Sequence, residues 1–126
     1  MRAVDTNVLV RLITRDDARQ AESAERWVEG GAWVSILALA ETVWVLSALF
    51  GRSASEISAV IEVLLNHKDL TLQEPDVVAA ALKSFRKRPS LGFADCLLLE
   101  LARKAGHLPL GTFDRELSKL DGAEKL

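Results

Sequence analysis

Four carboxylates stand within or at the ends of apolar stretches of this 126-residue chain: Asp5, Glu41, Asp95 and Asp114. A carboxylate that is removed from water on its own is costly and tends to take up a proton. Several of them stay ionised together only where cations compensate their charge. No Lys or Arg stands beside Glu41 or Asp95 in the sequence, so a bound metal ion is the simplest hypothesis, and the chemistry it predicts is that of a metal-dependent enzyme.

Glu41 and Asp95 are expected on the apolar faces of two helices. Residues three or four positions apart share a helix face. At these distances from the two acids the sequence holds mostly apolar side chains: Leu37, Ala38, Trp44 and Val45 around the first, and Leu91, Gly92, Leu98 and Leu99 around the second. We therefore expect both acids to face the core, where helix capping does not explain them.

Asp5 and Asp114 each stand where a predicted strand is followed by a helix. In an α/β domain, ligands gather beyond the carboxyl ends of the parallel strands, so we expect both acids at one edge of the sheet. Helix capping is the alternative at each position, because Asp is favoured as an N-cap. For either residue alone the cap is at least as good an explanation, but the joint pattern of four acids favours a site.

The donor set predicts Mg²⁺ or Mn²⁺, because these hard ions prefer carboxylate and water oxygens. Four negative charges balance two divalent ions, although one ion with bound waters is equally consistent. Zinc is disfavoured because it prefers Cys and His; Cys96 is the only cysteine, and the two histidines stand apart from the acids. Three polar neighbours either orient the ligands or make ordinary turn and cap hydrogen bonds: Thr6, Asn7 and Thr112.

An all-oxygen metal site without a covalent nucleophile is suited to phosphoryl transfer to water. A bound metal lowers the pKa of water, orients it and offsets charge on the phosphate. The formal net charge of −2 at first argues against a polyanionic substrate, but the remaining residues carry +2 once the four acids are set aside. Basic residues such as Arg11, Arg15 and Arg86 are then compatible with a nucleic-acid substrate, although residues 86–88 taken alone are better explained as a solvated helix end.

Composition and length predict a single domain, residues 1–126. Hydrophobic residues make up 49% and charged residues 27% of the chain, as in ordinary globular proteins. One cysteine excludes an internal disulfide, and the N-terminal residues lack a leader pattern. The longest apolar stretch, Ile36 to Phe50, is shorter than a membrane span and contains Glu41. These features predict a cytoplasmic protein.

Strand and helix signals alternate along the chain. Strands are predicted at residues 2–4, 33–34, 70–72, 108–113 and 123–126, and helices at 8–13, 18–29, 36–50, 53–66, 75–88, 92–104 and 115–120. Caps are expected at Ser35 and at Ser53, which has Glu56 three residues on. Short strands that alternate with helices are typical of an α/β domain with a parallel sheet.

Four segments resemble the four motifs of the PIN-domain family, in the order that the family has them. They are Val4–Val10, Val34–Glu41, Phe93–Leu98 and Gly111–Arg115, and the resemblance covers essentially the whole chain. In length and in the residues of these motifs, the sequence is most similar to the VapC-type toxins of prokaryotic toxin–antitoxin modules. One departure is Leu117, which stands where many relatives carry an aromatic residue; it concerns packing and not the metal chemistry.

The resemblance implies a three-layer α/β/α sandwich with a central, mainly parallel sheet. It implies an endoribonuclease that depends on Mg²⁺ or Mn²⁺ and is the toxin of a type II toxin–antitoxin system. Asp5, Glu41, Asp95 and Asp114 would be the catalytic metal ligands, and Thr112 the polar residue before the fourth acid. The implied partners are RNA, a second copy of the chain in a homodimer, and a cognate antitoxin that inserts a C-terminal segment near the site.

Two predicted helices carry more apolar side chains than one buried face needs. The helix predicted at 36–50 contains Trp44, Leu46, Leu49 and Phe50. The helix predicted at 53–66 contains Ile57, Val60, Ile61, Val63, Leu64 and Leu65. Such helices are either fully buried or used in association, and in a domain of this size association is favoured.

Two other functions predict different behaviour. A Mg²⁺-binding signalling domain would have adjacent acids after the first strand and a Lys after a late strand, and the sequence has neither. In a catalytically silent interaction module the acids would be caps and buried pairs, so removing Glu41 or Asp95 would cost stability. A metal site predicts instead that activity is lost while the metal-free fold is unchanged or more stable.

Overall fold

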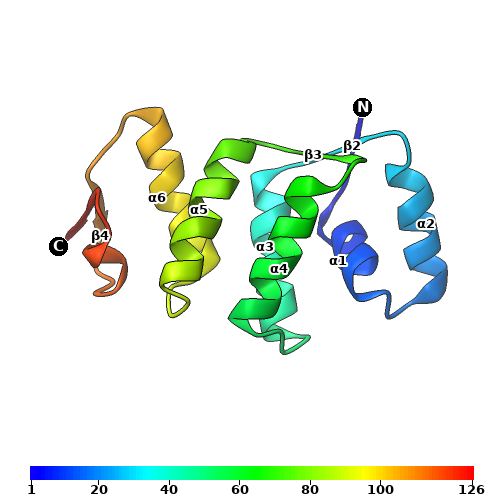
Figure 1. Cartoon of the computed structure of the whole chain (residues 1–126), viewed down its shortest axis with the longest axis horizontal. Helices are drawn as coiled ribbons and strands as arrows, with labels where there is room; N and C mark the ends of the chain where they lie inside the picture. The colour runs from blue at the N-terminus through cyan, green and yellow to red at the C-terminus, as the bar shows by residue number, and fades with distance from the viewer. The chain divides into compact units, whose positions relative to one another are not determined.

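Parallel strands join distant parts of the chain in the computed structural model, which describes residues 1–126. The chain divides into two compact units, residues 1–75 and 76–126 (Figure 1). In the first unit three strands form a sheet in the order β1 (Arg2–Ala3), β2 (Ala32–Val34) and β3 (Leu70–Leu72). Both strand pairs are parallel, with Arg2 opposite Ala32 and Ala32 opposite Leu70.

Four helices complete the first unit: α1 (Thr6–Thr14), α2 (Ala18–Val28), α3 (Ile36–Ala48) and α4 (Ala54–Asn66). Helix α1 packs against both α2 and α3, while α4 packs against β3 and α3. Fully buried aliphatic side chains fill the space between them: Leu9, Val10, Val34, Leu39, Leu46 and Ile61. The packing of α1 between two neighbours places the residues that follow β1 close to the middle of α3.

Local hydrogen bonds set where the helices begin. Ser35 accepts from the backbone N–H of Ala38 and caps α3, as predicted. Ser53 and Glu56 form the predicted capping box at the start of α4. Helix α1 begins at Thr6, two residues before the predicted start, because Asp5 supplies a cap there. Because these hydrogen bonds join residues only three positions apart, the sequence predicted the starts of α3 and α4 correctly.

The second unit contains α5 (Pro75–Lys87), α6 (Phe93–Ala105), β4 (Leu110–Thr112), the 3-10 helix η1 (Leu117–Lys119) and β5 (Ala123–Lys125). Phe85 of α5 and Phe93 of α6 meet edge to face, with ring centroids 5.9 Å apart. Strands β4 and β5 pair in parallel as a two-stranded sheet. Cys96 is buried, as expected of a small core residue.

The predicted α/β class, with parallel strands and flanking helices, is confirmed. The expectation that Asp5 and Asp114 follow strands of one sheet is wrong, because β4 pairs with β5 and belongs to a separate sheet. Sequence alternation indicates parallel strands but does not say which strands share hydrogen bonds. None of the helices has the length and apolar character that crossing a membrane requires.

Candidate active site

Thr6, the residue after Asp5, links the end of β1 to Glu41. The Asp5 Oδ1 atom accepts a hydrogen bond from the Val8 N–H at 3.1 Å, so this residue is the N-cap of α1. The adjacent Thr6 hydroxyl donates to Glu41 Oε2 at 3.2 Å and so links the first turn of α1 to the middle of α3. The cap uses one Asp5 oxygen and leaves Oδ2 for another partner, so capping and metal binding are compatible at this residue.

Glu41 is exposed, so the prediction that it faces the core is wrong. Its helical neighbours Leu37 and Trp44 are also exposed, at 70% and 64% of their surface. The buried face of α3 is formed instead by Ala38, Leu39, Thr42, Val43 and Leu46. Helix α3 is apolar almost all round, and for that reason apolar neighbours three and four residues away did not identify its inward face. The Glu41 carboxylate is therefore accessible.

Asp95 and Asp114 interact in the second unit. Asp95 lies in the first turn of α6 and is partly buried, as expected. Burial raises the pKa of the Asp95 carboxyl, and the negative charge of Asp114 raises it further. Since both causes disfavour the ionised form, a cation placed at this pair would relieve the repulsion.

Local hydrogen bonds hold Asp114 in a turn after β4. Its backbone N–H donates to Thr112 Oγ1 at 3.0 Å, and its Oδ1 accepts from the Leu117 N–H at 2.9 Å. Thr112 therefore makes the local turn hydrogen bond that was one of its two predicted roles. As with Asp5, one carboxylate oxygen is used by the backbone and Oδ2 is left for another partner.

Two of the predicted acids thus lie in each unit: Asp5 and Glu41, which is hydrogen-bonded to Thr6, in the first, and the interacting Asp95 and Asp114 in the second. The structure contains no group of three His, Cys, Asp or Glu side chains arranged to hold a metal ion. Nitrogen and sulfur donors are also poorly placed: His67 Nδ1 accepts from the Asp69 N–H, and burial raises the pKa of the Cys96 thiol to about 11. A thiol with that pKa stays protonated near neutral pH and is a poor ligand. The available donors are carboxylate oxygens, which suit Mg²⁺ or Mn²⁺.

A small pocket that sequence reasoning missed opens beside Asp5. It has a volume of about 400 Å³ and is lined by Asp5, Asn7, Val8, Arg11, Gln20, Ser23, Ala24 and Trp27. The four residues from α2 share one helix face, a spacing visible in the sequence. The pairing of that face with the start of α1 depends on how the two helices pack, which no sequence signal specified.

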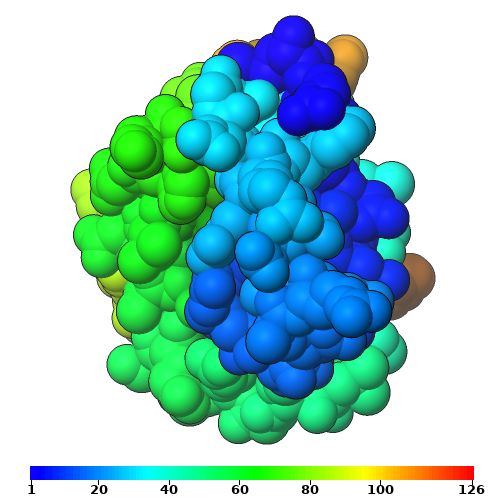
Figure 2. All heavy atoms as spheres, turned by 90° about the vertical axis from the view of Figure 1, so that its right-hand side faces the viewer, coloured from blue at the N-terminus to red at the C-terminus, as the bar shows by residue number.

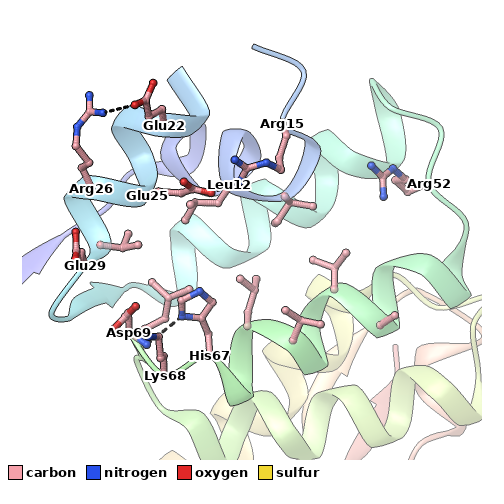
Figure 3. A pocket seen from close by; sticks show the side chains of 17 residues that line it. Leu12, Arg15, Glu22, Glu25, Arg26, Glu29, Arg52, His67, Lys68 and Asp69 are labelled. Carbon is pink, nitrogen blue, oxygen red and sulfur yellow. Dashed lines mark hydrogen bonds and ion pairs between the residues drawn. The ribbon is translucent and has the colours of Figure 1, made fainter. Parts of the chain in front are cut away.

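A larger groove of about 800 Å³ runs between α1, α2 and α4 (Figure 2), where the blue α2 faces the green α4. Apolar side chains form much of its wall, and charged side chains surround them (Figure 3). Arg15 pairs with Glu25, and Arg26 with Glu22. None of the four predicted acids lines this groove. Two of the basic residues considered compatible with a nucleic-acid substrate are thus paired within the protein, Arg15 with Glu25 and Arg11 with Asp16.

Comparison with known protein families gives a match to the PIN domain over residues 2–123, which includes parts of both units and all four acids. Comparison with curated proteins gives no match. The family match covers nearly the whole chain, and the parallel strands with flanking helices are consistent with it. The chain therefore belongs to the PIN domain family, a superfamily of nucleases.

Proposed function

We propose that this protein is a metal-dependent endoribonuclease that hydrolyses RNA phosphodiester bonds, and that it acts as the toxin of a type II toxin–antitoxin system. The observation that carries the proposal is the Asp95–Asp114 pair in a chain of a nuclease family. Burial and like charge make this pair unfavourable without a cation. We assign Asp5, Glu41, Asp95 and Asp114 as the acidic ligands of Mg²⁺ or Mn²⁺.

The ligand assignment is supported by the way the acids are held. Asp5, Glu41 and Asp114 each use one carboxylate oxygen in a hydrogen bond within the protein, to Val8, Thr6 and Leu117 respectively. A carboxylate that is fixed through one oxygen loses little freedom when the other binds a cation. The metal, when bound, supplies an activated water and offsets charge on the phosphate. Thr6 and Thr112 act as positioning residues for the acids.

Purified protein is expected to cut single-stranded RNA internally when Mg²⁺ or Mn²⁺ is added, and EDTA should stop the reaction. Gel electrophoresis of a labelled RNA measures cleavage, and sequencing of product ends from total RNA identifies the sites. Circular dichroism in EDTA shows whether the fold persists when activity is lost. Intact RNA in the presence of folded protein and either metal would instead support a catalytically silent interaction module.

The partners proposed with this function are RNA, a second copy of the chain and a cognate antitoxin, all in the cytoplasm. Exposed apolar side chains support association: Leu37 and Trp44 on α3, Leu49 at its C-cap, and Val63 on α4. Large apolar side chains clustered at a surface are typical of protein interfaces. We expect light scattering to report a dimer for the chain alone and a larger complex with the product of the neighbouring gene. A monomer under both conditions would contradict both associations.

A further inference from the structure

One wall of the small pocket beside Asp5 is formed by an aromatic side chain that other contacts hold in place. The Trp27 indole Nε1–H donates to the Ala3 carbonyl at 2.9 Å. The Arg2 guanidinium stacks over the indole, with Cζ 3.7 Å from the ring centroid, and donates to the Trp27 carbonyl at 3.2 Å. These contacts fix the ring, yet Trp27 remains 40% exposed. A fixed and partly exposed aromatic ring offers binding area at a low entropic cost.

The polar wall of the pocket presents hydrogen-bond donors. Arg11 Nε donates to Gln20 Oε1 at 2.6 Å. Because this bond uses the carbonyl oxygen of Gln20, the side chain offers its NH₂ group as a donor. Ser23 Oγ accepts from Arg26 at 3.4 Å, which leaves the Ser23 hydroxyl hydrogen for another acceptor. The wall thus favours a ligand edge that carries acceptors.

The charges around the pocket argue against a phosphate ligand. Asp5 lines the pocket, and the positive charge of Arg11 is already paired with Asp16 at 3.0 Å. An anion would therefore meet the Asp5 carboxylate, and Arg11, the cation that lines the pocket, is already paired. A volume of about 400 Å³ lies within the usual range for small-ligand sites. A neutral, flat ligand with acceptor atoms fits these features.

We propose that this pocket holds one base of the RNA substrate, next to the phosphate that is cut, and that Gln20 selects the base. The inference rests on the proposed function, because Asp5 is both an assigned metal ligand and one wall of the pocket. Proteins read single-stranded RNA by aromatic contacts and by hydrogen bonds to base edges. Guanine presents two acceptors, O6 and N7, on one edge, whereas adenine places an amino group beside N7. The donor wall therefore favours guanine over adenine.

Sequencing of the product ends from a randomised RNA pool tests this selection. The wild type should cut with guanine enriched at one fixed position relative to the cleaved bond. In Gln20→Glu one carboxylate oxygen still accepts from Arg11, but the NH₂ donor is replaced by a second acceptor. We expect the ratio of guanine to adenine at that position to fall about tenfold, the order expected for one good base contact.

Glu22→Gln is the matched control, because it makes the opposite change on the same helix and Glu22 lies outside the pocket. This control should keep the wild-type base profile. An unchanged profile in Gln20→Glu would overturn the inference and leave the ribonuclease proposal intact.

Trp27 fluorescence gives a second readout that does not depend on activity. The neutral nucleoside guanosine should change the emission of the metal-free protein more than adenosine does, and Trp27→Phe should remove that difference. Nucleoside binding without any RNA cleavage would support the pocket and contradict the proposed function. Equal responses to both nucleosides would overturn the base selection.

Discussion

Asp95→Asn is expected to abolish RNA cleavage and at the same time raise the thermal stability of the metal-free protein. Burial and the charge of Asp114 both raise the pKa of Asp95, so ionising this carboxyl costs more free energy in the folded chain than it does for an ordinary aspartate. Asparagine has nearly the same shape and removes that charge. Loss of a metal ligand removes several kcal/mol of transition-state stabilisation, which corresponds to a fall of roughly 10³-fold in rate. Thermal melts in EDTA and RNA cleavage assays in Mg²⁺ measure the two effects.

Asp76→Asn is the control, because the surroundings of Asp76 favour its ionised form, whereas those of Asp95 disfavour it. Asp76 Oδ2 accepts from Lys104 Nζ at 2.9 Å, and the hydrogen bond from Lys104 holds the pKa of this carboxyl below its usual value. Its replacement should leave cleavage unchanged and make the protein slightly less stable, as expected for an exposed ion pair. A marked loss of stability in Asp95→Asn would contradict the metal assignment and support a structural role for this acid.

Sequence reasoning succeeded where the determining interactions are local. Ser35, and Ser53 with Glu56, satisfy backbone N–H groups only three residues away, so their patterns predicted the starts of α3 and α4. The same reasoning placed Asp114 at the end of a strand. It failed at Glu41, because an apolar helix such as α3 has no contrast between its faces. Which side of α3 is buried depends on α1 and α4, and no local pattern contains that information.

Non-local packing also explains the missed pocket. Gln20 and Trp27 lie on one face of α2, but Asp5 and Arg11 reach that face only because α1 packs against α2. The strand pairing of β4 with β5 is non-local in the same sense, since the sequence indicated both strands without their partners. Residue types at motif positions therefore predicted the acids, whereas the surfaces around them required the folded chain.

The affinity of the protein for Mn²⁺ is expected to fall as the pH is lowered, beginning at a higher pH than ordinary aspartates would allow. Metal ligands must be deprotonated, and the raised pKa of Asp95 means that this residue takes up a proton at a higher pH than an ordinary aspartate does. Below that pKa the affinity should fall about tenfold per pH unit for each proton displaced. In the metal-free protein, the contribution of Asp95 to the stability of the fold should change in the opposite direction, increasing as the pH is lowered. Its folded state binds this proton more tightly than the unfolded chain does, so the contribution of Asp95 to stability is present at low pH and is lost as the pH rises through the raised pKa.

Calorimetric Mn²⁺ titrations at several pH values check this prediction, and Asp114→Asn shows its cause. Removing the Asp114 charge eliminates one of the two causes that raise the pKa of Asp95, while burial remains. Any Mn²⁺ binding that this variant retains should therefore weaken at a lower pH than in the wild type. Asp121→Asn, which changes an exposed aspartate in the same unit, should leave the pH dependence as it is. A wild-type affinity that does not change with pH would exclude carboxylates as the ligands, because protons and metal would then not compete for the same oxygens.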